Sequence, residues 1–417
     1  MPRIRRERLL VPAAFVTALG NNVQLIAGAL LVLRTDHTLL SVGWLFIAVA
    51  APQVLLSPLF GRWADRYDRR RLWAGSDLAS AVLALALPLW LWWGGAPGPG
   101  VYAANLGLAV VSALFFPASA ALIKERVRPE QLSRFTANYE MATQAGMFLS
   151  ATVGGLCVQA FGAAPLLLVN SGTFIFSALC VFAVGRAPEV RGGASPGVAG
   201  PEERSVSRPA RLGWQIALFA QSSVVVTVFN ALLPKLVLDE FQRGAGTYGA
   251  IDALGSLGFL AATWSYRALV PKVGDLRIAL SGFALCALLF AVEPDFGVAG
   301  LFPMVLCGAF LFGHARIAAR THLLASVDVR YAGRVFGTAN GAGLAATIAA
   351  MLLVAEITDH TDCTYGFAAT ALLSAAAVGA CALRLSGRNR TPEAVFPATP
   401  IAASVNGAHE AELSPTS

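Results

Sequence analysis

Long apolar runs alternate with short charged groups along this chain. A membrane-spanning helix needs roughly 20 mainly apolar residues, and runs of that kind recur from the beginning of the sequence to residue 385. The first part supplies candidates at residues 9–33, 40–60, 72–93, 101–123, 139–160 and 165–184. The second part supplies candidates at residues 212–238, 248–266, 276–292, 298–319, 335–356 and 365–385. The pattern predicts an all-α membrane protein with twelve transmembrane helices.

Composition supports a membrane location. Hydrophobic residues make up 56% of the 417 residues and charged residues 13%, and the mean hydropathy is +0.63. A soluble chain of this length would have too little polar material to cover its surface. The lipid bilayer is therefore the expected solvent for most of this protein.

A polar stretch at residues 185–211 separates the two sets of apolar runs. It is rich in Gly, Pro, Ser and charged residues, a composition that does not support a packed core. The sequence after residue 385 has a similar character. We therefore expect two six-helix bundles with pseudo-symmetry, at residues 1–184 and 212–385, joined by a cytoplasmic linker at 185–211 and followed by a disordered cytoplasmic tail at 386–417.

The distribution of basic residues predicts the orientation. Cytoplasmic loops of membrane proteins retain Lys and Arg, and with the N-terminus inside only Arg34, Lys235 and Arg243 of the 31 Lys and Arg residues fall outside. The outer loops carry acids instead, among them Glu293 and Asp359. Both termini are predicted to be cytoplasmic. The net charge of +7 is explained by orientation and anionic lipid, so no nucleic-acid partner is expected.

Two matching basic loops indicate an internal duplication. The segment 131–138 contains Arg134 before the fifth apolar run, and 200 positions later the segment 331–338 contains Arg334 before the eleventh. Matching loops before equivalent spans are the pattern expected of two repeated halves.

The loop between the second and third runs reads Gly-Arg-Trp-Ala-Asp-Arg-Tyr-Asp-Arg-Arg-Arg-Leu from Gly61 to Leu72. It resembles the signature loop of the major facilitator superfamily, commonly G-x-x-x-D-R-x-G-R-R/K. An Asp in place of the last Gly, and Asp77 shortly afterwards, resemble the branch that contains macrolide efflux pumps and the enterobactin exporter. The resemblance implies the major facilitator fold and a gating role for Gly61, Asp65, Arg66, Asp68, Arg69, Arg70, Asp77, Arg134 and Arg334.

Asp65 also has a physical reason to act as a latch. A carboxylate at the inner end of the second run can face the positive N-terminus of a neighbouring helix, and we expect that helix to be the one that Gly333 and Arg334 open. The arginines at positions 69–71 can equally be explained as residues that keep the loop inside.

A second exporter signature, Gly-x-x-x-Gly-Pro-x-x-Gly-Gly, is matched only in part in the fifth run. Gly146, Gly154 and Gly155 occupy expected positions, but Ser150 and Ala151 replace the central Gly-Pro. These small residues allow close helix packing, either as ordinary contacts or as a feature that sets the direction of transport.

Polar residues inside the runs are the candidates for substrate binding and coupling. In facilitator-type folds the first, fourth, seventh and tenth spans line the cavity, which implies substrate contacts for Asn21, Asn22, Gln24, Asn105, Gln221 and Asn230. Ionisable groups at membrane depth are functional candidates, here Asp252, His314 and Glu140. Asp252 could instead face an outer vestibule, and His314 could be a hydrogen-bonded packing residue.

These observations predict a secondary transporter in a bacterial plasma membrane. The expected activity is export of a small organic molecule (a drug, antibiotic, siderophore or other natural product) by a proton-coupled antiporter that is a monomer without metal or cofactor. Import of a nutrient or siderophore, and a receptor or scaffold that does not transport, are the alternatives. The sequence contains no Walker loop, G-x-S-x-G or H-E-x-x-H motif, so an enzyme is not expected.

Overall fold

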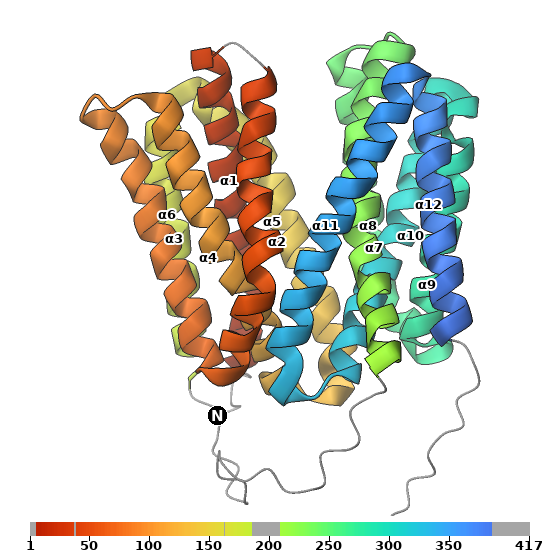
Figure 1. Cartoon of the computed structure of the whole chain (residues 1–417), viewed down its shortest axis with the longest axis horizontal. Coiled ribbons are helices and arrows are strands. Elements are labelled where there is room, and N and C mark those ends of the chain that lie inside the picture. Colours follow the sequence, from red (N-terminus) through yellow and green to blue (C-terminus); the bar gives the residue numbers. More distant parts are fainter. Residues whose placement is uncertain (1–5, 37–38, 162, 186–208, 386–417) are drawn as a thin grey trace, which may run out of the picture. The chain divides into compact units, whose positions relative to one another are not determined.

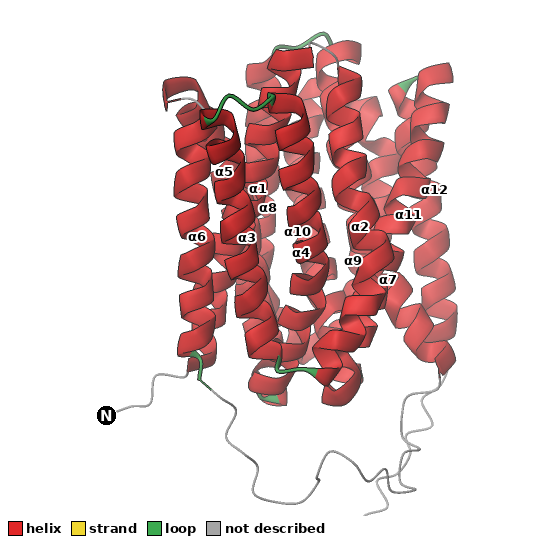
Figure 2. Cartoon of the chain, turned by 60° about the vertical axis from the view of Figure 1, so that its left-hand side comes forward, coloured by secondary structure: helices red, strands yellow, loops and turns green. Residues whose placement is uncertain are grey.

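The structure is a computed structural model that describes residues 6–36, 39–161, 163–185 and 209–385. Within 25–48 and 151–164, and at 209, 210 and 245, only the backbone is described. The described elements are helices throughout (Figure 2). The linker expected at 185–211 and the tail expected at 386–417 lie almost entirely outside the described residues, so both remain predictions.

The first half of the chain, helices α1–α6, follows the order of the apolar runs. It begins with a short 3-10 helix, η1, at Arg6–Leu9, and another, η2 at Pro129–Gln131, precedes α5. The α-helices are α1 Leu10–Asp36, α2 Leu39–Arg66, α3 Arg69–Trp92, α4 Pro97–Arg126, α5 Leu132–Phe161 and α6 Ala163–Ala183.

The second half, helices α7–α12, repeats this order. Its short elements are the π-helical turn η3 Lys235–Glu240 and the 3-10 helices η4 Glu293–Phe296 and η5 Val329–Tyr331. The α-helices are α7 Pro209–Pro234, α8 Ala245–Val273, α9 Asp275–Val292, α10 Gly297–Ser326, α11 Ala332–His360 and α12 Cys363–Leu385. η2 before α5 is matched by η5 before α11, as the 200-residue repeat predicts.

Most helices extend beyond the apolar runs. The run at 139–160 lies within α5, which begins at Leu132, and the run at 335–356 lies within α11, which begins at Ala332 and ends at His360. The added turns are polar, and they carry Arg134 and Arg334. Hydropathy detects the part of a helix that suits lipid, whereas backbone hydrogen bonding continues into the polar region on either side.

Seven stretches of the described residues are long and apolar enough to cross a membrane. One of them, Asp275–Ser326, includes both α9 and α10. Helix α8 is not among the seven, because Asp252 and a series of Gly, Ser and Thr residues lower its hydropathy. The fold is a bundle of long membrane-type helices, and the count of twelve crossings remains an expectation.

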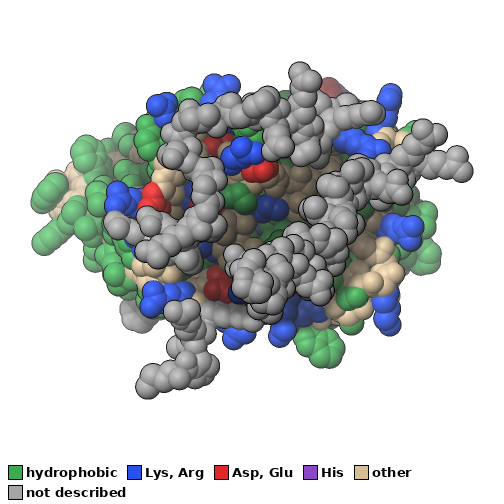
Figure 3. Space-filling view, turned by 90° about the horizontal axis from the view of Figure 1, so that it is seen from below, with side chains coloured by type: hydrophobic (Ala, Val, Ile, Leu, Met, Phe, Trp, Pro, Cys, Tyr) green, Lys and Arg blue, Asp and Glu red, His purple; other side chains and the backbone are tan. Residues whose placement is uncertain are grey.

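The two halves meet along specific helices. α2 lies beside α11 at the end of the unit where α11 begins, as the lower part of Figure 1 shows. α5 contacts α8 and α10 of the second half. Lys and Arg side chains are spread around the face at this end in the view of Figure 3.

Candidate functional site

Asp65 connects the end of α2 to the beginning of α11. Its Oδ1 accepts a hydrogen bond from the backbone N–H of Gly333 at 2.6 Å, and its Oδ2 accepts one from the N–H of Arg334 at 3.0 Å. The Arg334 Nε lies 3.4 Å from Oδ2. The first backbone N–H groups of a helix have no hydrogen-bond acceptor within the helix and lie at its positive dipole end. The Asp65 carboxylate supplies acceptors for two of them.

Glycines allow this contact. A Cβ built on Gly61 would lie 2.5 Å from the carbonyl oxygen of Gly333, and a Cβ on Gly333 would lie 2.7 Å from Asp65 Oδ1. One turn towards the membrane, Asn340 Nδ2 donates to Ser57 Oγ at 2.9 Å. We call Ser57, Gly61, Asp65 and their partners Gly333, Arg334 and Asn340 the α2–α11 contact.

Burial and hydrogen bonding have opposite effects on the charge of Asp65. The residue lies past the apolar run that ends at Phe60, and its side chain is 4% exposed. Burial raises the pKa of the Asp65 carboxyl above its ordinary value, while the amides of Arg334 and Gly333 act in the opposite direction. Desolvation therefore outweighs the hydrogen bonds in its effect on the ionised form of Asp65.

The arginines of the loop have different surroundings. Arg69 bridges the halves: its guanidinium donates to Val329 O at 2.6 Å and pairs with Glu125 at 3.0 Å. Arg70 donates to Phe182 O within the first half at 3.2 Å. Arg66 is exposed. Within the described part of the chain, Arg69 is the one of these three whose hydrogen bonds reach the second half.

Two acids near the loop have local roles in the structure. Asp68 caps α3, accepting from the backbone N–H groups of Arg70 and Arg71 at 3.0 and 3.2 Å. Asp77 is buried between α1, α3 and α6, where Ser177 Oγ and Thr17 Oγ1 donate to it at 2.6 and 3.3 Å. Asp77 is thus separate from the α2–α11 contact with which the sequence analysis grouped it, because α3 turns that face into its own half.

Asp328 shows the same capping chemistry at η5. Its Oδ1 accepts from the N–H of Arg330 at 2.8 Å. This hydrogen bond, with the Arg330 guanidinium nearby, lowers the pKa of Asp328, although partial burial opposes the shift. The cap fixes the turn that presents Val329 O to Arg69.

Glu140 forms a buried ionic cluster between α5 and α10. Its carboxylate lies 2.9 Å from Arg316 Nε and 2.5 Å from Arg320 Nη1, and both Glu140 and Arg320 are almost fully buried. Arg320 also lies 4.4 Å over the ring of Tyr139. Glu140 is a candidate coupling residue in the sequence analysis, and the structure places it between the halves.

Other polar contacts of α5 lie close to this cluster. Arg267 of α8 donates to Asn138 Oδ1. Arg134 is exposed at the start of α5, in the position that corresponds to Arg334, but among the described residues it forms no ion pair with a carboxylate of α8. We call Asn138, Glu140 and their partners Arg267, Arg316 and Arg320 the α5 contact.

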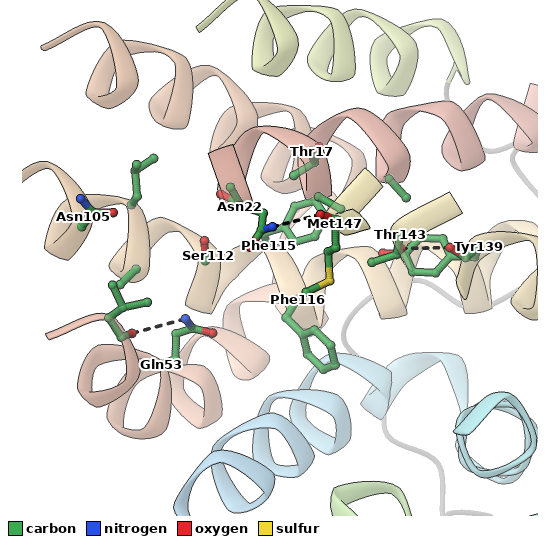
Figure 4. A pocket seen from close by; sticks show the side chains of 16 residues that line it. Thr17, Asn22, Gln53, Asn105, Ser112, Phe115, Phe116, Tyr139, Thr143 and Met147 are labelled. Atoms are coloured by element: carbon green, nitrogen blue, oxygen red, sulfur yellow. Dashed lines mark hydrogen bonds between the residues drawn. The ribbon is translucent and has the colours of Figure 1, made fainter. Parts of the chain in front are cut away.

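A first cavity of about 310 Å³ lies within the first half. Its wall combines apolar surface with amide and hydroxyl groups, several of which are labelled in Figure 4. Asn21, Asn22 and Asn105 line it, as expected from the sequence. Asn22 donates to Met147 O at 3.1 Å, and Asn105 donates to Val101 O at 2.9 Å.

A second cavity of about 460 Å³ is lined by both halves. Asn22 and Met147 line this cavity as well as the first, so the two adjoin. Asn230, expected at the cavity from the sequence, and the coupling candidate Asp252 both line it. Rings of Phe229, Phe259, Phe290 and Phe312 also contribute to its wall.

Gln24 and Gln221, which were expected at the cavity, and the coupling candidate His314 make other contacts. Gln24 is buried against α6, where it accepts from Asn170 Nδ2 at 3.3 Å, and Gln221 donates to Ser374 of α12 at 2.7 Å. His314 is buried, with Nε2 3.1 Å from Ser265 Oγ and Nδ1 2.9 Å from Phe310 O. The helix of each carries several polar faces, and only the packing decides which face meets the cavity.

The glycines of the fifth run serve helix packing where they can be described. A Cβ on Gly146 would lie 3.1 Å from Leu19 N, which shows that α5 approaches the backbone of α1 closely there. Gly154 and Gly155 lie outside the residues whose packing is described, so their role remains a prediction.

An aromatic cluster joins the halves between the cavities and the α2–α11 contact. Phe219 of α7 and Phe336 of α11 have ring centroids 5.7 Å apart, and both approach Phe116 of α4 within 6.4 Å. Phe116 also lines the first cavity, and Phe336 follows Gly333 by about one helical turn. The rings therefore form an apolar layer between the cavities and the α2–α11 contact.

Sequence reasoning missed several residues of the cavity wall. Gln53 and Thr143 lie outside the first, fourth, seventh and tenth spans, to which the family resemblance assigns the cavity, whereas α2 and α5 also line the first cavity. Glu293 was assigned to an exposed outer loop. In the structure it is 1% exposed and lines the second cavity, because η4 folds its side chain inward. An isolated acid beside an apolar run was the available signal.

Among the described residues, no group of three or more His, Cys, Asp or Glu side chains is placed to hold a metal ion.

The chain resembles known transporters over most of its length. The family model for the Major Facilitator Superfamily matches residues 10–351. A Bacillus subtilis protein described as an uncharacterized MFS-type transporter is 23% identical over 376 residues, covering 82% of this chain and 84% of its own. The multidrug efflux pump Tap of Mycobacterium tuberculosis is 23% identical over 387 residues, covering 87% and 90% respectively.

Solved structures show the same fold. A bacterial homologue of the iron transporter ferroportin, in an outward-facing state, aligns with a TM-score of 0.72 at 17% identity and covers 91% of this chain and 100% of that chain. The human organic anion transporter MFSD10 aligns with a TM-score of 0.71 at 15% identity, with the same coverage. A long helical bundle with a central cavity between its halves is the arrangement of a membrane transporter. The chain belongs to the major facilitator superfamily, which is a family of transporters and not of enzymes.

Proposed function

We propose that this protein exports a small organic molecule across a bacterial plasma membrane by alternating access, in exchange for protons. In this proposal twelve helices cross the membrane as two six-helix halves, both termini are cytoplasmic, and the protein works as a monomer. A drug, an antibiotic, a siderophore or another natural product would be the cargo. The description of several relatives as multidrug efflux pumps supports export.

The observation that carries the proposal is the position of the contacts between the halves relative to the cavity. Both halves line the second cavity, while the α2–α11 contact and Arg69 join them where the loops carry Lys and Arg. If the basic end is cytoplasmic, this arrangement corresponds to an outward-facing state closed at the inner side. Breaking these contacts while the outer ends close would expose the cavity to the cytoplasm.

Measuring the transport of a fluorescent dye by cells tests the proposal. Cells that produce the protein should retain less of a fluorescent amphipathic dye than cells that produce none, and a protonophore should abolish the difference. Greater accumulation in the producing cells would favour an importer. No flux of any compound in either direction would favour a receptor or scaffold, and efflux that survives the protonophore would remove proton exchange from the mechanism.

Reporter fusions test the expected topology. Fusions after Gly95 and Glu293 should report the outside, and fusions after Arg70, Gly197 and the last residue should report the cytoplasm. A cytoplasmic signal after Glu293 would contradict the count of twelve spans.

A further inference from the structure

Glu293 has an unusual environment for a carboxylate. It begins η4, the 3-10 turn between α9 and α10, and its side chain is 1% exposed. Neither carboxyl oxygen has a hydrogen-bond partner among the described residues. The side chain nevertheless lines the second cavity, so the cavity is where a partner can reach it.

The surroundings of Glu293 supply no positive charge at hydrogen-bonding distance. Its Oε1 rests against α10, where a Cβ on Gly308 would lie 3.9 Å away. The other titratable or charged groups that line the cavity are Tyr248 and Asp252 of α8, Cys286 of α9 and Arg316 of α10. Arg316, the one cation in that lining, is paired with Glu140 at 2.9 Å.

Aromatic rings make the rest of the wall suited to a cation with an apolar body. Phe229 and Phe290 are stacked with centroids 5.5 Å apart and planes 12° apart, and both line the cavity. Phe259 and Phe312 add further apolar surface. Aromatic faces attract ammonium groups, and an ionised carboxylate without a partner is costly in an apolar site.

We propose that Glu293 is the binding site for the ammonium group of an amphipathic organic amine, whose apolar part packs against Phe229 and Phe290. The cation would give the buried carboxylate the partner that the described protein lacks, and the cavity of about 460 Å³ accommodates a molecule of modest size. This inference deepens the proposed function by naming a substrate class, and its transport aspect rests on that function.

A matched pair of fluorescent probes tests the site on the purified full-length protein. Dansylcadaverine carries a primary ammonium group at neutral pH, whereas its N-acetyl derivative has nearly the same shape and no charge. We expect Glu293→Gln to weaken dansylcadaverine binding about tenfold or more, as for loss of a charge-assisted hydrogen bond, and to leave the N-acetyl derivative nearly unaffected. Asp295→Asn, an exposed acid in the same turn, is the control and should change neither probe.

An equal effect of Glu293→Gln on both probes, or no effect on either, would overturn the proposal. Equal weakening of both probes would mean that Glu293 acts through protonation or packing and does not bind the ammonium group. No effect on either probe would mean that the amine binds elsewhere. If the Glu293→Gln variant does not fold, a competition experiment on the unsubstituted protein tests the proposal instead. Hexylamine should displace dansylcadaverine much better than hexanol does, and equal displacement would overturn the proposal. Since binding does not depend on transport direction, amine binding without export would contradict the proposed function and leave this site in place.

Discussion

The α2–α11 contact and the α5 contact join the same two halves with different chemistry. At the α2–α11 contact one carboxylate, Asp65, meets two backbone amides and an arginine that is 56% exposed. At the α5 contact Glu140 meets two guanidinium groups, and that of Arg320 is 5% exposed. The first uses weak and replaceable interactions near water, whereas the second places a full ionic cluster in the interior. The comparison indicates that Asp65 is suited to switching and Glu140 to holding the halves in register.

The largest expected effect is at the α5 contact. Glu140→Gln would leave two arginines beside a neutral amide, and breaking a buried ion pair costs roughly 3 to 5 kcal/mol. We expect a large fall in the melting temperature of the purified protein and loss of transport. Glu356→Gln is the control, because its exposed pair with His360 should contribute little. A Glu140→Gln variant as stable as the unsubstituted protein would contradict the holding role.

The next effect concerns the close approach at the α2–α11 contact. Gly333→Ala would place a Cβ 2.7 Å from both Ala64 Cβ and Asp65 Oδ1, and overpacking of this kind costs about 1 to 3 kcal/mol. We expect α2 and α11 to separate, which would increase alkylation of a cysteine introduced at Ser57. Gly343→Ala, whose nearest neighbour atom would be 3.5 Å away, is the control. Unchanged alkylation in Gly333→Ala would show that the contact can adjust.

A smaller effect is expected from the latch residue itself. A carboxylate at a helix N-terminus contributes about 0.3 to 2 kcal/mol, so Asp65→Asn should shift the population towards the inward-open state by up to about thirtyfold. Turnover should fall while the amount of protein in the membrane stays nearly constant, and Asp65→Glu should do less harm. Normal transport by Asp65→Asn would make the loop a topology signal, and failure to insert would make it a folding element.

The smallest effect tests whether the neighbouring acid is separate from both contacts. Asp68 caps α3 within the first half, and loss of a cap costs typically about 1 kcal/mol. Asp68→Ala should lower the melting temperature slightly without changing the alkylation at Ser57. A change in alkylation comparable to that in Gly333→Ala would show that Asp68 takes part in the α2–α11 contact.

Sequence patterns predicted the long helices and the position of Asp65 more successfully than the cavity. A hydropathy profile needs only the local composition of the chain, so it predicts long membrane helices well. The contact of Asp65 with Gly333 and Arg334 could be anticipated because a carboxylate and a helix N-terminus attract each other. Which polar face of a helix meets the cavity depends on packing against several neighbours. For that reason Asn21 and Asn22 line the first cavity, whereas Gln24 contacts Asn170 of α6.

The ion cluster and Glu293 show a second limit. Glu140 lies 176 positions before Arg316 and 180 before Arg320, and no local pattern indicates that it meets them. Glu293 follows an apolar run and looks like an ordinary loop acid until the 3-10 turn at Glu293–Phe296 is known. Side-chain direction within one turn decides whether such a residue faces water or the interior.

The layer formed by Phe116, Phe219 and Phe336 has a consequence for the energy of the cell. A protein that opens a polar cavity in a membrane can dissipate the proton gradient, because a continuous file of water through it would conduct ions. Apolar constrictions exclude water and so block ion conduction. These three rings, contributed by both halves, would interrupt such a file between the cavity and the α2–α11 contact, so that ions do not leak through the protein while it transports.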